Sequence, residues 1–225
     1  MKDNNRMLSN DESNLMSINE LPKNNDQFLL NIIHDLRSYL NVITSAAQFM
    51  EHNTYKGDNN LKYIEIIKRN SFKMLKLINN LIDSNKIENN YYKLNKKNID
   101  IVPMLENTIS CVEKFASERN IRLVFDTNEE ECIMAIDPEA IDRVVMNLLS
   151  NAIKFSNENS EIYINLLVKD KEIEVSFKDE GCGISKEEKE RIFERFYQGK
   201  NNDNIEGSGI GLNLCMLFVK AHGGK

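Results

Sequence analysis

The chain has 225 residues, a net charge of −6 and a pI near 5.3. Hydrophobic residues make up 41% and charged residues 28%, a soluble balance with room for one large or two modest domains. The acidic balance argues against nonspecific binding to nucleic acid, and no apolar run reaches the roughly 18 residues of a membrane span. We therefore expect a cytoplasmic chain that would be tethered to a membrane only through a longer protein.

Four cysteines lie far apart in the sequence, with no CxxC pair: Cys111, Cys132, Cys182 and Cys215. Such spacing without neighbouring histidines does not fit a metal site or a disulfide framework. We expect all four to be buried, reduced thiols.

Residues 1–23 are rich in Asn, Asp and Ser and are predicted to form a flexible lead. Asn24, with Gln27 three residues on, is a possible capping box for a helix that runs to about Glu51. Apolar residues on this helix alternate by four and three, as in helices that pack lengthwise. The seam consists of Leu29, Ile33, Leu36, Leu40, Ile43, Ala47 and Met50, widened by Ile32, Tyr39 and Ala46.

In this register His34 and Asp35 point away from the seam. A histidine beside a carboxylate on an exposed flank is poorly placed for packing and well placed for chemistry. The alternative is an ordinary solvated histidine, which is more common on a helix.

A second helix is predicted from Leu61 to Glu88, after a loop at 52–60. Its apolar positions alternate in the same way, at Ile64, Ile67, Ser71, Met74, Ile78 and Leu81. Two such helices form a hairpin whose apolar faces cover each other only by half. We therefore expect a homodimeric four-helix bundle formed by residues 24–90; the alternative is packing against the rest of the chain.

Residues 91–98 are a polar linker and a predicted hinge, and residues 99–225 have a mixed α/β pattern. Five strands are predicted, at residues 99–102, 121–125, 132–136, 161–169 and 171–178. Four helices are predicted: one at 103–119, one that starts at Pro138 with Asp137 as its cap, one that starts at Ser185 and one near Gly209. Helices with a mostly antiparallel sheet in this order predict an α+β sandwich.

Asn147 and Asn151 lie four residues apart on one predicted helix face, with Lys154 one turn further on. Two amide oxygens suit a hard cation such as Mg²⁺, and a lysine suits phosphate. This signal alone is weak, because Asn and Lys are common on surfaces.

Two glycine-rich segments are further candidates for nucleotide binding. Asp179, Gly181 and Gly183 follow a predicted strand, where a carboxylate can accept a hydrogen bond from an exocyclic amine. A second segment opens a helix whose free N–H groups can bind phosphate, and consists of Gly207, Gly209, Gly211 and Leu212. Each could also be an ordinary turn.

Residues 198–206 are polar, and with Phe193 and Phe196 at their base they fit a mobile lid over a nucleotide. A disordered surface loop is the alternative.

In this order the segments resemble the catalytic core of sensor histidine kinases of two-component signalling, over residues 28–225. The motifs are the phospho-acceptor motif at 34–40, the N box at 147–154, the first glycine box at 179–184, the F box at 191–197 and the second glycine box at 207–212. The resemblance implies a dimerisation and acceptor hairpin followed by an ATP-binding domain of the histidine-kinase, gyrase and Hsp90 type.

The resemblance also implies residue roles in ATP binding. Asp179 would contact the adenine amino group, Asn151 would bind Mg²⁺ with support from Asn147, and Lys154 would reach phosphate. Gly209 and Gly211 would shape the lid end around the triphosphate, and the other glycines of the two boxes would belong to the same ATP site. Asn147 stands where related ATP hydrolases have a Glu that activates water.

For phosphoryl transfer, the resemblance implies that His34 takes the γ-phosphoryl group and Asp35 orients its imidazole. The group would then pass to an aspartate on the receiver domain of a response regulator. Ser38 would position water for the reverse, phosphatase reaction.

Two departures from the family pattern stand out. Tyr39 replaces the usual proline, which predicts a straighter helix, and the chain ends at Lys225, before two further strands of the family's domain. The rival interpretations are a non-catalytic dimeric phosphotransfer or scaffold module, and an ATPase or Ser/Thr kinase with the same nucleotide fold.

Overall fold

The computed structural model describes the chain except for residues 1–22, 53–59, 90, 171 and 200–207. The predicted lead, most of the first loop, most of the predicted lid and Gly207 therefore lie outside the described residues. The chain forms two compact units, residues 1–75 and 76–225.

The first unit contains helix α2 (Lys23–His52) and the start of helix α3 (Asn60–Glu88), in agreement with both predicted helices. Ile32 and Ala46 are buried, and Tyr39 between them is half-buried, with the ammonium of Lys73 6.0 Å from its ring. α2 is uninterrupted through this position, because tyrosine keeps the backbone N–H that proline lacks. The predicted cap at Asn24 lies at an end whose side chains are outside the described part.

One stripe of the predicted seam is exposed. Ile33 and Leu40 are 48% and 54% exposed, and Ala47, seven residues on, is exposed too. Ile32, Tyr39 and Ala46 have the same spacing one position earlier, which places them on the face that is covered within the hairpin. The hairpin therefore covers only part of its apolar surface, as the sequence predicts.

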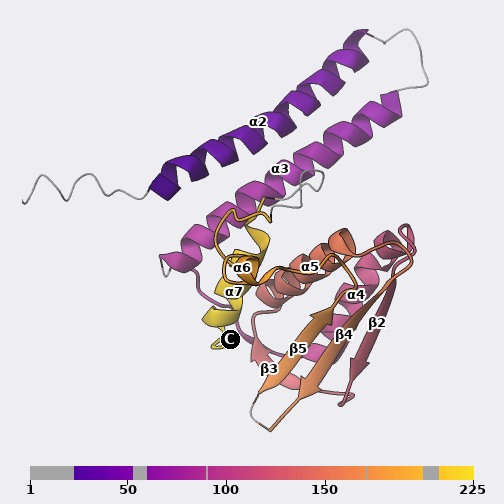
Figure 1. Ribbon diagram of the computed structural model, residues 1–225, viewed down its shortest axis with the longest axis vertical. Helices are drawn as coiled ribbons and strands as arrows, with labels where there is room; N and C mark the ends of the chain where they lie inside the picture. The colour runs from indigo at the N-terminus through magenta and orange to yellow at the C-terminus, as the bar shows by residue number, and fades with distance from the viewer. Residues whose placement is uncertain (1–22, 53–59, 90, 171, 200–207) are drawn as a thin grey trace, which may run out of the picture. The chain divides into compact units, whose positions relative to one another are not determined.

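The second unit contains a three-stranded sheet in the order β2 (Arg122–Thr127), β4 (Glu161–Val168) and β5 (Ile173–Lys178). β4 pairs with β5 in antiparallel register and with β2 in parallel, so the sheet is mixed. Strands β1 (Lys97–Asp100) and β3 (Ile133–Ile136) form a separate antiparallel pair. Helices α4 (Ile101–Ser117) and α5 (Pro138–Phe155) cover one face of the larger sheet (Figure 1), which confirms the α+β sandwich.

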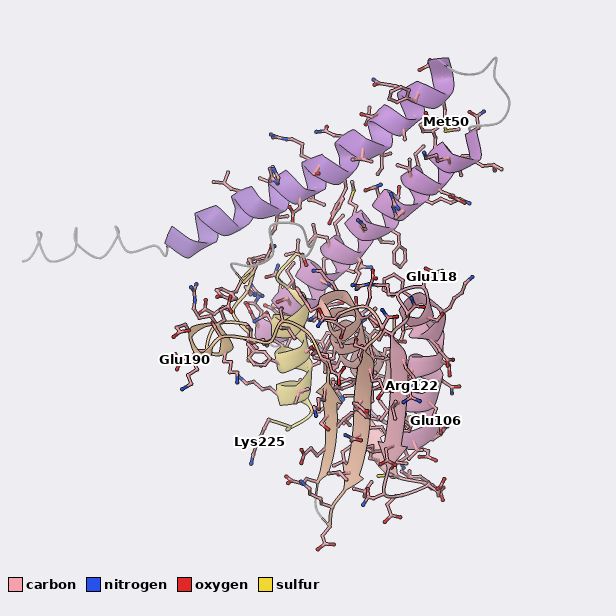
Figure 2. All side chains as sticks on the ribbon, turned by 45° about the vertical axis from the view of Figure 1, so that its right-hand side comes forward. Met50, Glu106, Glu118, Arg122, Glu190 and Lys225 are labelled. Carbon is pink, nitrogen blue, oxygen red and sulfur yellow. The ribbon has the colours of Figure 1, made fainter. Side chains whose placement is uncertain are left out.

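The core of this unit lies between that sheet and the two helices. Alternate residues of β4, namely Ile162, Ile164 and Leu166, are fully buried, as the period of two requires. Their partners on the helices include Leu105, Ile109, Val112, Val145, Leu149 and Ile153. Each such side chain contributes about 1.5–3 kcal/mol by burial. The opposite face of α4 is exposed and carries charged residues such as Glu106 (Figure 2).

The junction of β1 and α4 differs from the prediction. Ile101 and Val102 were expected at the end of a strand, but they form the buried first turn of α4. Asp100 is the reason: its carboxylate accepts hydrogen bonds from Val102 N (3.2 Å) and Cys132 N (3.0 Å) and caps the helix. The predicted cap of α5 is confirmed, since Asp137 accepts from the first free amides of that helix.

The predicted linker packs against the second unit. Tyr92 lies edge-on to Phe218 with ring centroids 5.3 Å apart, and Asn95 N donates to the Asp137 carboxylate at 2.9 Å. Ile87 and Leu94 join the same apolar cluster, which is formed by Ala140, Val144, Leu214, Cys215 and Phe218. The boundary between the two units lies within α3, between Leu75 and Lys76, because the end of this helix packs with the residues that follow it.

The prediction of four buried cysteines is wrong in part. All four are free thiols, but Cys111 and Cys182 are exposed, Cys132 is half-buried, and only Cys215 is buried. Among the described residues, no helix is long and apolar enough to cross a membrane.

Candidate functional site

Helix α5 is the centre of the candidate nucleotide site. Asn147, Asn151 and Lys154 are half-buried on it. Helix α7 (Gly211–Ala221) packs beside α5, and a Cβ on Gly211 would lie 3.5 Å from the amide oxygen of Asn147. The first turn of α7 is therefore placed directly against the predicted N box.

The start of α7 offers free donors at this place. Its N-cap residue, Ile210, makes no side-chain capping bond, and the first intrahelical bond found runs from Leu214 N to Ile210 O. Among the described residues the amides of Gly211 and Leu212 have no backbone acceptor, and the helix dipole adds partial positive charge there. Beside two asparagines, this end is suited to phosphate.

The first glycine segment is attached to the other end of α5. Gly181 forms a β-bridge with Ser156, and a Cβ at this glycine would lie only 2.5 Å from the carbonyl oxygen of Phe155. Asn157 also donates to Glu180 O at 2.9 Å. Only glycine fits this close approach to the Phe155 carbonyl, so Gly181 is the residue that lets the segment pack against the end of α5.

Asp179 is exposed at the start of that segment. One of its carboxylate oxygens accepts the Gly181 N–H at 2.9 Å, which fixes the side chain locally. In the described part of the chain no hydrogen bond to its second oxygen is found, so this oxygen can accept one from a ligand. Gly183 has a φ of +70° and open space around it.

The two ends of the predicted lid meet at a narrow neck. Phe196 N donates to Gly209 O at 2.8 Å, and both residues have positive φ, +64° and +65°. The predicted anchoring by two phenylalanine rings differs in detail, because the ring of Phe193 is 42% exposed. Instead its carbonyl accepts from Asn213 Nδ2 at 2.9 Å.

α5 thus brings three predicted segments together: the N box on the helix itself, Gly181 at its C-terminal end and Gly211 beside its middle. Asn151 makes no side-chain hydrogen bond to any described residue, so its amide oxygen can serve as a cation ligand. In the described ranges no three His, Cys, Asp or Glu side chains are grouped so that they could hold a metal ion, so a metal here would depend on amide and phosphate oxygens.

The candidate acceptor lies in the first unit. The side chain of His34 is 83% exposed, and its Nδ1 lies 3.5 Å from Oδ1 of Asp35. Nε2 therefore points to solvent while Nδ1 faces the carboxylate. Ser38 is exposed one turn further along α2.

The sequence interpretation missed a polar cluster at the end of α3. Asp83 forms an ion pair with Arg143, and Arg195 contacts both Ser84 and Glu88. The signal was a serine seven residues after buried Leu77, that is, a polar residue in an apolar stripe.

The chain matches two family models. "His Kinase A (phospho-acceptor) domain" covers residues 24–90, and "Histidine kinase-, DNA gyrase B-, and HSP90-like ATPase" covers residues 136–225. The chain is also 28% identical to sensor histidine kinase WalK of Bacillus subtilis over 203 residues, which is 88% of this chain and 33% of WalK. The chain therefore belongs to the sensor histidine kinases, and it spans about a third of the length of that relative.

Solved structures agree on the fold. Histidine kinase AdeS of Acinetobacter baumannii superposes with a TM-score of 0.66 at 20% identity, over 84% of this chain and 86% of AdeS. Histidine kinase ThkA, solved in complex with response regulator protein TrrA, gives a TM-score of 0.58 at 22% identity, over 76% of this chain and 50% of that one.

Proposed function

We propose that this chain is an ATP-dependent protein-histidine kinase that phosphorylates His34 and passes the phosphoryl group to an aspartate of a response regulator. The observation that supports the proposal is the arrangement along α5, which carries the two asparagines, lies beside the first turn of α7 and has the Gly181 segment at its C-terminal end. An exposed histidine paired with a carboxylate completes the required parts.

In this proposal the second carboxylate oxygen of Asp179 accepts from the adenine amino group. The amides of Gly211 and Leu212, with the Lys154 ammonium, bind the phosphates. Asn151, supported by Asn147, is the ligand for Mg²⁺, which when bound offsets the negative charge on the transferred group.

At His34 the carboxylate of Asp35 favours the tautomer with a proton on Nδ1, because that nitrogen faces the carboxylate. The lone pair on Nε2 attacks the γ-phosphorus, the bond from this phosphorus to the bridging oxygen breaks, and ADP leaves. Asp35 stabilises the positive charge that develops on the ring. An amide at Asn147 is no base for water, which favours transfer to His34 over hydrolysis.

The active assembly in this proposal is a homodimer formed through residues 24–90. The exposed stripe of Ile33, Leu40 and Ala47 supports it, together with Leu61 and Phe72 on α3, which are 76% and 69% exposed. A second hairpin would cover these side chains in a four-helix bundle. We assign residues 91–98 to the connection and 99–225 to the ATP-binding domain.

The partner in the second step is a receiver domain that docks near His34 and Ser38. The likeness to ThkA, which was solved with a response regulator bound, is compatible with such a partner. Ser38, one turn from Asp35, is assigned to positioning water for the reverse reaction.

The test is incubation of the chain with γ-labelled ATP and Mg²⁺. We expect protein-bound label that is lost in acid and kept in base, as phosphohistidine requires, and no label in the Asn151→Asp variant or with a chelator. Acid-stable label would instead support a Ser/Thr kinase, and free labelled phosphate without labelled protein would support an ATPase. Absence of ATP binding would support the scaffold alternative.

A further inference from the structure

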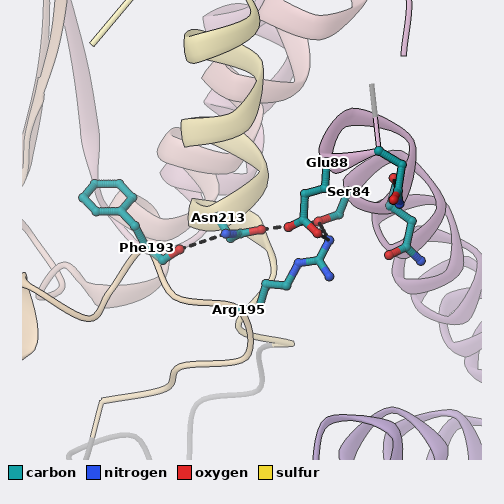
Figure 3. A network of polar contacts seen from close by, with 7 residues as sticks. Ser84, Glu88, Phe193, Arg195 and Asn213 are labelled. Atoms are coloured by element: carbon teal, nitrogen blue, oxygen red, sulfur yellow. Dashed lines mark hydrogen bonds and ion pairs between the residues drawn. The ribbon is translucent and has the colours of Figure 1, made fainter. Parts of the chain in front are cut away.

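The end of α3 makes polar contacts with α5, with α7 and with the segment that contains Arg195. The carboxylate of Asp83 pairs with Arg143 on α5, four residues before Asn147. Ser84 Oγ accepts from Arg195 Nη2 at 2.7 Å and donates to Asn213 Oδ1 at 3.3 Å on α7. Glu88 completes the group with an ion pair of 2.7 Å to Arg195 (Figure 3).

Ser84 lies between the two flanks of the predicted lid. Arg195 comes just before Phe196, where the neck begins, and Asn213 comes shortly after Gly209, where the neck ends. Asn213 also donates to Phe193 O at 2.9 Å, so one hydroxyl on α3 is bonded to both sides of the neck.

The contacts of Ser84 are buried or partly buried, and several groups depend on them. Ser84 is 2% exposed and Asn213 5% exposed. Arg195 Nε is buried and has no hydrogen-bond partner in the part of the chain that the structure describes, so this guanidinium relies on its contacts with Ser84 and Glu88. Without the Ser84 hydroxyl, the amide oxygen of Asn213 and a charged donor would both lose a partner in a buried place.

We propose that Ser84 is a positioning residue that couples α3 to nucleotide binding. Its hydroxyl fixes Arg195 and Asn213 so that the neck and the first turn of α7 keep the arrangement that phosphate binding requires. The proposal rests on the proposed function, and it adds that ATP affinity depends on a helix that also belongs to the acceptor hairpin. Because such coupling is reciprocal, bound ATP must in turn stabilise the end of α3.

The test compares the full chain with its Ser84→Ala variant. ATP affinity is measured by calorimetry, and amide hydrogen exchange of residues 80–88 is followed with and without ATP. We expect Ser84→Ala to bind ATP about fivefold or more weakly. We also expect ATP to slow exchange at 80–88 in the wild-type chain and much less in the variant, an effect that a purely structural role would not produce.

Two further variants sharpen the comparison. Ser71→Ala removes an exposed serine from the same helix and should leave both readouts unchanged. Glu88→Gln keeps a hydrogen-bond acceptor for Arg195 but removes the charge, so a smaller loss of ATP affinity is expected. Because the Glu88 side chain is partly exposed, we expect this variant to fold.

Unchanged ATP affinity in both Ser84→Ala and Glu88→Gln, or equal slowing of exchange in variant and wild type, would overturn the coupling. If the wild-type chain still forms acid-labile label in that case, the proposed function stands and only this inference fails. A wild-type chain that binds no ATP would overturn both.

Discussion

Two of the three histidines of the chain have described side chains, and they differ in what their ring nitrogens contact. His222 is occupied on both sides: its Nε2 accepts from Asp137 N at 3.0 Å, and its Nδ1 lies 2.8 Å from Phe218 O, to which it donates in that tautomer. His34 has only the Asp35 carboxylate beside Nδ1 and is 83% exposed. Of these two rings, only that of His34 has a nitrogen available for reaction.

The cysteines allow a prediction at the same scale. Burial, the largest cause, raises the pKa of the Cys215 thiol from 9.0 to about 12. At pH 8 its thiolate fraction is then about one in 10⁴, and the thiolate is the reactive form. Under iodoacetamide at pH 8, Cys111 and Cys182 should be alkylated while Cys215 stays unmodified, as peptide mass spectrometry would show.

Unfolding in denaturant, where all four cysteines should react, is the control for this experiment.

The same pKa shift predicts a pH dependence of folding. Between pH 9 and about 12 the thiol ionises in the unfolded chain and not in the folded one, so stability falls as pH rises through this range. Cys215→Ala should remove this part of the loss of stability at alkaline pH. In the alkylation experiment, modification of folded Cys215 at the rate of Cys182 would contradict the account.

The exposure of His34 could be predicted from the sequence, because the seam fixes which positions of α2 face outward. The environments of the cysteines could not. Cys182 lies between two glycines in an exposed turn and Cys215 lies on the covered face of α7, a difference that depends on tertiary packing.

Among the elements, the neck between Phe196 and Gly209 depends on one glycine in particular. Gly209 and Gly183 have nearly the same φ, +65° and +70°, but only Gly209 is crowded: its Cβ would lie 2.6 Å from Phe196 Cα. An alanine at Gly183 meets only the cost of a left-handed backbone, about 1–2 kcal/mol. Gly209→Ala adds a backbone clash and should destabilise the chain clearly more.

Denaturant unfolding of the two variants measures this difference, with ATP binding as a second readout. Gly209→Ala should also displace the neck and the start of α7 and so weaken ATP binding. Equal losses of stability in both variants would show that the close contact with Phe196 does not constrain the neck.

The sequence predicted helices and strands well where a helix-capping residue and the spacing of apolar residues indicate the same boundary. Asp137 and Pro138 start α5 where expected, and the second glycine-rich segment precedes α7. The boundary of β1 was misplaced because Ile101 and Val102 favour strands. In the structure Asp100 caps a helix instead, and its carboxylate is also held by Cys132 N, just before β3. A tertiary contact of this kind has no signal in a local pattern.

For the whole molecule, the division of the chain within α3 is the main feature that the sequence did not predict. Asp83, Ser84 and Glu88 are ordinary polar residues for the end of an amphipathic helix, and only the folded chain brings Arg143, from a distant segment, beside one of them. The linker likewise has a polar composition, yet Tyr92 and Leu94 anchor it on α7 and α5. The end of the hairpin and residues 91–225 therefore belong to one packed unit.

The central claim is that ATP held around α5 delivers its phosphoryl group to His34, and the three histidines of the chain provide the comparison. The most direct measurement is labelling with γ-labelled ATP of the wild type, His34→Ala and His52→Ala chains, with the labelled peptide mapped at neutral pH. The account predicts acid-labile label on His34, complete loss in His34→Ala and wild-type labelling in His52→Ala. Acid-labile label that persists in His34→Ala would contradict it.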